Sequence, residues 1–182
     1  MVAHERRRPA AQDWFSFDGE SSVREARWRN QCGEAMSGES QEGARSVVER
    51  FVQAINGHDL EAIVRCFAPD YHDIEPAHPT RQIKGGQPEV RKNWGTVVEG
   101  MPDFRTEVEM VAVEGDTTWI EHDRSGTRAD GTRLHLRGVN IFGIRDGQFA
   151  WGRIYMETVE EDGIDLEERV RRMAEGNPDA GA

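Results

Sequence analysis

Residues 137–157 read RGVNIFGIRDGQFAWGRIYME, a pattern that predicts a β-hairpin. Two apolar-rich runs flank Asp146-Gly147, a dipeptide typical of the tight turn in a β-hairpin. Turn residues of the same kind occur at 114–116 and 130–131. The spacing therefore predicts an antiparallel meander of four strands, over residues 104–112, 117–125, 132–144 and 148–157.

Before these strands, the apolar residues repeat with the period of a helix. One helical face gathers Val47, Val48, Phe51, Val52 and Ile55, and Asn56-Gly57 ends that helix. Asp59 caps a second helix that Pro69 ends, and Pro88 begins a third that stops near Gly100. Helices followed by a meander predict an α+β fold in which a cone-shaped, curved antiparallel sheet packs on three N-terminal helices and encloses a pocket.

The pattern of apolar and polar residues divides the chain into an N-terminal extension, a folded domain and a C-terminal tail. Residues 1–43 are polar and small without a sustained period, so we expect a disordered or loosely attached extension. Two other interpretations stay open: a true start at Met36, or docking of the aromatic residues at 14–17 on the domain or a partner. Residues 44–160 form the domain, and residues 161–182 form a tail with a short helix capped by Asp165.

Composition excludes several function classes. The net charge of −11 and the pI near 5.0 argue against a nucleic-acid partner and against a polybasic membrane anchor. No apolar stretch approaches the roughly 20 residues that span a bilayer. Cys32 and Cys66 lack metal-ligand spacing. We therefore expect a cytoplasmic protein with a small-molecule ligand and with neither metal nor cofactor.

Residues 70–78 gather five titratable side chains besides a tyrosine. Glu75 and His78 have a helical spacing that would suit a metal, but Pro76 and Pro79 make a helix unfavourable there. A carboxylate at a pocket rim suits general acid–base chemistry better, which favours Glu75. The remaining titratable residues of interest are interpreted as parts of a solvated loop: Asp70, Asp73 and His78.

Strand alternation separates the polar residues of the meander. His122 and Arg124 share one face of strand 117–125, Glu121 and Asp123 share the other, and either face could line the pocket. Asn140 interrupts an apolar run, so its amide either bridges parts of the core or donates to a ligand oxyanion.

Two further strands present an apparent inner face by the same alternation. In the first strand this face gathers Phe104, Thr106, Val108, Met110 and Ala112. In the last strand it gathers Phe149, Trp151, Arg153, Tyr155 and Glu157. Glu157 is then either a pocket acid or the solvated start of an acidic run.

Several segments together resemble the SnoaL-like group of the nuclear transport factor 2-like superfamily. They are residues 51–63, 67–70, 84–85, 101–104 and 137–157. The resemblance implies the cone fold with its pocket, and a homodimer formed through the outer face of the sheet. It leaves function open, because this fold carries isomerases, cyclases, hydrolases and binding modules.

Three enzyme types within that fold offer templates. Ketosteroid isomerase has an acidic base before a proline, which Glu75 resembles, but its oxyanion donors would fall at Phe51 and Asn140, and phenylalanine cannot donate. SnoaL-like cyclases use an acid near the end of the last strand, which Glu157 resembles. The Arg–Asp pair of limonene epoxide hydrolase has no ordered counterpart here.

The resulting hypothesis is a SnoaL-like enzyme, of cyclase or isomerase type, that applies cofactor-independent acid–base catalysis to a small apolar carbonyl compound. Glu157 would transfer the proton, Glu75 would be a second base, and Asn140 and His122 would polarise the oxygen. Substrate-binding side chains would be Tyr155, Trp94, Phe51, Arg153 and Tyr71. Two alternatives are a non-catalytic ligand-binding or dimerisation module and a domain whose role depends on a partner of the N-terminal arm.

Overall fold

The computed structural model describes residues 38–160 and 163–176. The interpretations offered for the N-terminal extension lie outside the described residues, except at its end, where the first helix begins at Gly38 rather than near Ala44. Within the described segments, no helix has both the length and the apolar character needed to cross a membrane.

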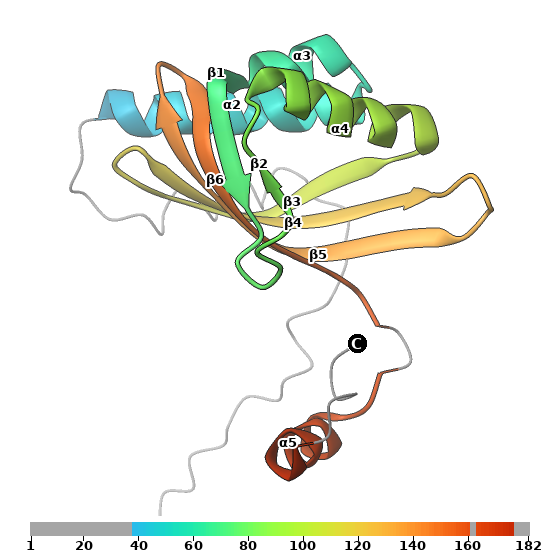
Figure 1. Cartoon of the computed structure of the whole chain (residues 1–182). Helices are drawn as coiled ribbons and strands as arrows, with labels where there is room; N and C mark the ends of the chain where they lie inside the picture. Colours follow the sequence, from blue (N-terminus) through green and yellow to red (C-terminus); the bar gives the residue numbers. More distant parts are fainter. Residues whose placement is uncertain (1–37, 161–162, 177–182) are drawn as a thin grey trace, which may run out of the picture. The chain divides into compact units, whose positions relative to one another are not determined.

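Four helices and six strands are described. The helices are α2 (Gly38–Asn56), α3 (Leu60–Arg65), α4 (Gln87–Gly100) and α5 (Leu166–Glu175). The strands are β1 (Phe67–Ile74), β2 (Gln82–Ile83), β3 (Arg105–Glu114), β4 (Thr117–Thr127), β5 (Arg133–Arg145) and β6 (Gln148–Thr158). The strand order is β2-β1-β6-β5-β4-β3, and α2, α3 and α4 lie against one face of this curved sheet (Figure 1). The predicted α+β class, the three helices and the β3–β6 meander are confirmed.

The segment from Phe67 to Ile74 differs from the prediction, because it forms β1 rather than the end of a helix and a loop. The second helix already ends at Arg65, and β1 runs parallel to β6 while β2 pairs antiparallel to β1. One strand pairing of the sheet is therefore parallel. Pro69 and the polar residues after it conceal this strand, since proline and aspartate are depleted in strands.

Local signals fix the helix ends as expected. The Asp59 carboxylate accepts a hydrogen bond of 2.9 Å from the Ala62 amide, and the Asp165 carboxylate accepts one of 2.8 Å from the Glu168 amide. Both satisfy amide groups that a first helical turn leaves without partners. The caps predicted for α3 and α5 are thus confirmed.

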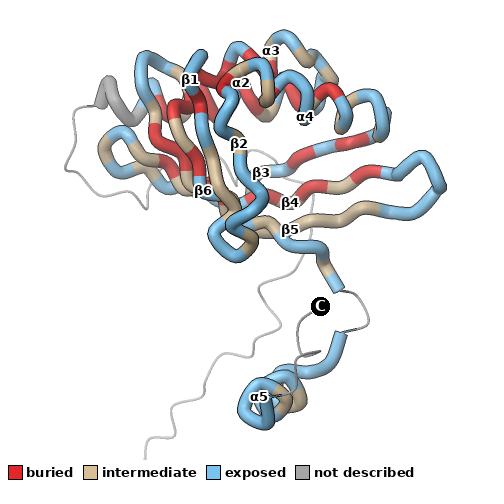
Figure 2. Tube along the Cα trace, in the orientation of Figure 1, coloured by how far each residue is buried: buried red, intermediate tan, exposed pale blue. Residues whose placement is uncertain are grey.

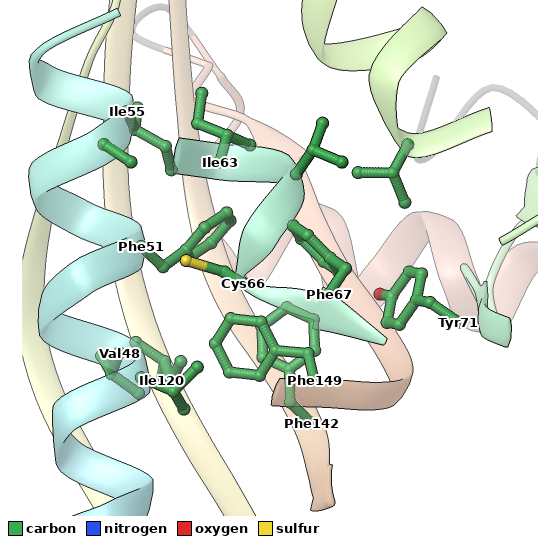
Figure 3. Packing of buried hydrophobic residues seen from close by; sticks show 14 of the residues in the cluster. Val48, Phe51, Ile55, Ile63, Cys66, Phe67, Tyr71, Ile120, Phe142 and Phe149 are labelled. Carbon is green, nitrogen blue, oxygen red and sulfur yellow. The ribbon is translucent and has the colours of Figure 1, made fainter. Parts of the chain in front are cut away.

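The core lies between the helices and the inner face of the sheet (Figure 2). The ring of Phe51, on α2, lies at its centre and contacts the rings of Phe67 and Phe149 edge-on or nearly so, each with centroids 5.3 Å away. Figure 3 shows this aromatic cluster beside α2. Edge-to-face pairs add to the stability that burial of large rings provides.

Gly86 holds the start of α4 close to β1 and supplies a stability test. Its φ is +66°, and a Cβ there would lie 2.1 Å from the carbonyl oxygen of Pro69. We expect Gly86→Ala to lower the free energy of unfolding by about 1–3 kcal/mol from backbone strain alone, with a further loss from the clash. Urea unfolding measures the change.

Gly131→Ala is the matched control, because Gly131 has a φ of +81° with open space around its Cβ position. The difference between the two variants isolates the Pro69 contact. Equal losses would mean that this contact does not constrain the α4 start.

Candidate functional site

A cavity of about 130 Å³ lies between the helices and the inner face of the sheet. Aromatic and aliphatic side chains from α2, α4, β1, β5 and β6 form most of its wall, and Figure 3 shows several of them. The residues lining it are Phe51, Phe67, Tyr71, Asp73, Ile83, Val90, Trp94, Arg124, Asn140, Phe142 and Ile154. An apolar cavity with a few convergent polar groups is the usual form of a small-molecule site.

Four residues expected to contact the ligand lie in this wall: Phe51, Tyr71, Trp94 and Asn140. The face of β4 that carries His122 and Arg124 is the inner one, since these side chains are only 1% and 9% exposed. His122 is not among the residues that line the cavity. The sequence left open which face of β4 is the inner one, and the structure shows that it is the face with His122 and Arg124.

Glu157, Tyr155 and Arg153 do not line the cavity, contrary to the expected strand face. The pairing of β5 with β6 shifts between Gly143–Trp151 and Ile144–Phe149, which leaves Ala150 as an extra residue. Phe149 therefore faces inward, whereas the odd-numbered residues after it face outward. The Glu157 carboxylate is exposed and lies 3.4 Å from the His78 imidazole.

Glu75 also lies outside the cavity wall. Its carboxylate forms an ion pair of 3.0 Å with Arg81, in the connection between β1 and β2. The two glutamates singled out from the sequence therefore do not converge on one site.

Asp73 is the acid that the cavity does contain, although the sequence placed it in a solvated loop. One carboxylate oxygen accepts a hydrogen bond of 2.9 Å from the Tyr71 hydroxyl, and the other accepts one of 2.9 Å from the Ile83 amide. Burial raises the pKa of Asp73, an effect that these two hydrogen bonds partly oppose. The signal available in the sequence was the alternation of Phe67, Tyr71 and Asp73 at odd positions.

Tyr71 stays protonated at any working pH. Burial raises its pKa, and the neighbouring Asp73 charge raises it further. The phenol therefore acts as a fixed donor that orients the Asp73 carboxylate.

Arg124 is a buried cation in the same cavity. Its guanidinium carbon lies 5.7 Å from the centroid of the Trp94 ring, within the range of a cation–π contact. The Nε and Nη2 atoms are buried without a hydrogen-bond partner, and none of the ion pairs within the described segments includes Arg124. Burial lowers the pKa of Arg124 to about 10, so it remains charged at neutral pH.

Two more buried polar groups lie on this side of the sheet. His122 Nδ1 is 3.2 Å from the Thr106 hydroxyl, while its Nε2 has no hydrogen-bond partner. Burial, assisted by the Arg124 charge, lowers the pKa of His122 to about 2, so the ring is neutral. The Oδ1 of Asn140 is likewise buried without a partner. Over residues 38–160 and 163–176, no three His, Cys, Asp or Glu side chains cluster as metal ligands would.

The family model of the SnoaL-like domain matches residues 48–151, which include all the polar groups of the cavity and every lining residue except Ile154. The chain belongs to the SnoaL-like family. The match thus includes β1 to β5 and the first four residues of β6, and the cone fold is that of the nuclear transport factor 2-like superfamily.

Solved structures share this SnoaL-like fold at low sequence identity. A proposed SnoaL-like polyketide cyclase from Jannaschia sp. CCS1 has a TM-score of 0.58 and 20% identity, with 69% of this chain and 92% of that chain covered. An LEH-like epoxide hydrolase from M. tuberculosis has a TM-score of 0.56 and 17% identity, covering 65% and 85%. TsrD from Streptomyces laurentii has a TM-score of 0.55 and 23% identity, covering 68% and 91%. No curated protein matches the chain significantly.

Proposed function

We propose that this SnoaL-like domain is an enzyme that uses cofactor-independent acid–base catalysis on a small, mostly apolar carbonyl compound. The observation that carries the proposal is that one largely apolar cavity contains both an acid and a cation. The acid is Asp73, which is hydrogen-bonded and has a raised pKa, and the cation is Arg124, which has no ion-pair partner. Asp73 takes the proton-transfer role that the sequence pattern predicted for Glu157 and Glu75. Arg124 takes the oxygen-stabilising role; Asn140 would share it only through its Nδ2 donor, because its unpaired Oδ1 is an acceptor.

The chemistry follows from the two charges. The Asp73 carboxylate removes a proton from the carbon beside the carbonyl, and burial makes it a stronger base than an exposed aspartate. The carbonyl oxygen gains negative charge as that bond breaks, and the Arg124 guanidinium stabilises the charge in a site with little water. Returning the proton to another position would complete an isomerisation, and attack of the carbanion on a second carbonyl would complete a cyclisation.

The comparisons support a small-molecule role. Proteins described as an epoxide hydrolase and a proposed polyketide cyclase share the fold. Both descriptions concern chemistry on small organic compounds, which agrees with the cavity.

Exchange of carbon-bound hydrogen tests the proposal without knowledge of the product. A panel of small ketones and aldehydes is incubated with the protein in D₂O, and NMR follows deuterium uptake at the carbon beside the carbonyl. We expect at least one compound to exchange faster with wild-type protein than with Asp73→Asn. Exchange rates that match the buffer for every compound would contradict the enzyme.

One observation favours a second candidate, a non-catalytic ligand-binding module. Glu75 and Glu157 both lie outside the cavity, as that alternative predicts. The module would bind members of the same panel, detected by calorimetry, without any exchange. Binding together with exchange would exclude it.

We also propose a homodimer through the outer face of the sheet, the surface formed by outward side chains of β3–β6. Met110 and Tyr155 on this surface are 59% and 41% exposed, and Trp119, Val139, Ile141 and Trp151 are partly buried there. Light scattering coupled to size-exclusion chromatography should report twice the chain mass of 20.6 kDa. Ile141→Glu should shift the mass toward the monomer, because it places a charge inside a desolvated contact.

Met173→Glu, which adds the same charge to an exposed apolar position on α5, is the control and should leave the dimer intact. A wild-type protein that is monomeric at micromolar concentration would contradict the dimer.

A further inference from the structure

The Arg124 side chain is the least compensated group in the described part of the chain. Two of its nitrogens are buried without partners, and its side chain takes part in none of the ion pairs there. Removing a cation from water costs several kcal/mol unless a counter-charge replaces the lost hydration. The structure therefore retains a charge that a bound anion would stabilise.

We propose that the cavity binds a small carboxylate, and that the substrate is a 2-oxo acid with a short apolar body whose acid group lies at Arg124. This inference rests on the proposed function and names the substrate class of the same site. It narrows the small, mostly apolar carbonyl compound of the proposed function to one that carries a negatively charged acid group.

The shape of the guanidinium favours a carboxylate over other anions. Nε and Nη2 form one edge of the planar group, and two parallel hydrogen bonds from such an edge match the two oxygens of a carboxylate. The Trp94 ring, 5.7 Å away, can pack on the guanidinium face but cannot serve as a hydrogen-bond acceptor in its plane. The edge therefore has no acceptor from the described residues, and a ligand carboxylate that reaches it would supply one.

None of the other polar groups that line the site forms an ion pair with Arg124. The carboxylate oxygens of Asp73 already accept hydrogen bonds from Tyr71 and Ile83. His122, two residues before Arg124 on β4, contributes no charge because its ring is neutral. The cavity thus holds a buried cation that forms no ion pair or printed hydrogen bond with the Asp73 carboxylate, and a ligand carboxylate placed at its Nε–Nη2 edge would supply the missing acceptors.

Size and wall chemistry define the rest of the ligand. The cavity volume of about 130 Å³ is close to the roughly 150 Å³ of an engineered apolar cavity that binds benzene. Phe51, Phe67 and Phe142 supply flat apolar walls. A six-membered ring or a short branched chain attached to the acid group fits this space.

A 2-oxo acid has both groups that the site requires: an acid group that Arg124 can bind and a carbonyl group beside a carbon that Asp73 can deprotonate. Its keto oxygen and one carboxylate oxygen lie side by side in a planar 2-oxo acid, so this pair of oxygens can take the place of the two carboxylate oxygens at the Arg124 edge. Asp73 then takes the proton from C3, the C3–H electron pair forms the C2–C3 double bond, and the C2–O π pair moves to the oxygen beside Arg124. Return of the proton from Asp73 to C3 restores the acid, so the step balances without any co-reactant.

Binding of benzoate, compared with its neutral analogue benzamide, tests the recognition by calorimetry. We expect benzoate to bind wild-type protein at least about tenfold more tightly, because a charge-assisted bidentate pair is stronger than neutral hydrogen bonds. Arg124→Gln should abolish the preference, and Arg105→Gln, which removes an exposed arginine, should preserve it. Equal affinities in wild-type protein, or a preference that survives Arg124→Gln, would overturn the proposal.

A second measurement uses wild-type protein alone, so it tests the proposal even if Arg124→Gln does not fold. In wild-type protein labelled with ¹⁵N-arginine, one buried side-chain Nε–H signal should shift on addition of benzoate and remain in place on addition of benzamide. Absence of the benzoate shift would also overturn the proposal.

Failure of this inference can be told from failure of the proposed function. Benzoate has no exchangeable proton beside its acid carbon, so its binding does not depend on catalysis. Deuterium uptake at C3 of 3-methyl-2-oxobutanoate tests the reaction itself. Benzoate preference without uptake would retain the carboxylate site and reject the 2-oxo acid as substrate.

Discussion

Asp73→Asn is expected to lower kcat for proton transfer by about 10²–10⁴-fold, the range that a positioned acid or base contributes. The amide has nearly the same shape and still accepts the hydrogen bond from the Ile83 amide, so the fold and the cavity should persist. KM should change little, because ligand recognition lies with Arg124 and the aromatic wall. Steady-state kinetics on whichever compound exchanges in D₂O measures both constants.

The pH profile supplies an independent readout of the same group. Burial raises the pKa of Asp73, and protonation removes the base, so kcat should fall as the pH decreases through this raised pKa. The Tyr71 hydrogen bond lowers that pKa. Tyr71→Phe should therefore move the acidic limb of the profile to higher pH, which a merely structural role for Tyr71 would not do.

Asp70→Asn is the matched control for Asp73→Asn. Asp70 lies on the same strand, but its exposed carboxylate pairs with Arg145 at the surface. Its substitution should leave kcat within a small factor of wild type. An Asp73→Asn variant with wild-type kcat would remove Asp73 from the reaction.

The wrong faces predicted for the later part of β6 and for Met110 in β3 have a common physical origin in β-bulges. The alternation of β6 predicted that Phe149 and Glu157 share a face, and it would have been right for a regular strand. The extra residue at Ala150 reverses the face for everything that follows. A similar shift between Val108 and Met110 turns Met110 outward in β3, where it is 59% exposed. A period-two pattern carries no mark of such an inserted residue.

Positions in regular strand segments were predictable. The pairing of β4 with β5 runs without a shift from Thr117 to Thr127, so the alternation that grouped His122 with Arg124 holds. Asn140, opposite Ile120 in this ladder, is buried as an amide in an apolar run should be. Alternation alone could not decide which face is inner, because both faces of β4 carry charged or titratable residues.

Asp73 was missed for a different reason. Its role depends on β1, whose sequence FAPDYHDI contains proline and polar residues that are rare in strands. Long-range pairing with β6, far away in the sequence, stabilises this strand and turns Tyr71 and Asp73 toward the cavity. Local propensity contains no information about such a partner.

We expect the free energy of unfolding to fall as the pH decreases, because the buried His122 ring is neutral in the folded chain. Its pKa is about 2 in the folded chain, against about 6.5 in an unfolded chain. Below about pH 6.5 the unfolded state binds a proton that the folded state does not, so stability is present above that pH and is lost as the pH falls. The loss contributed by His122 should approach about 1.4 kcal/mol for each pH unit below pH 6.

Urea unfolding at a series of pH values between about 5 and 7.5 measures this slope in wild-type protein and in His122→Gln. Glutamine cannot be protonated in this range and can still hydrogen-bond the Thr106 hydroxyl, so the variant should show a slope shallower by up to about 1.4 kcal/mol per pH unit. His72→Gln, at an exposed position on β1, should retain the wild-type slope. Parallel slopes in wild-type protein and His122→Gln would show that the folded chain accepts a proton at His122, and that the buried ring is not held neutral beside Arg124.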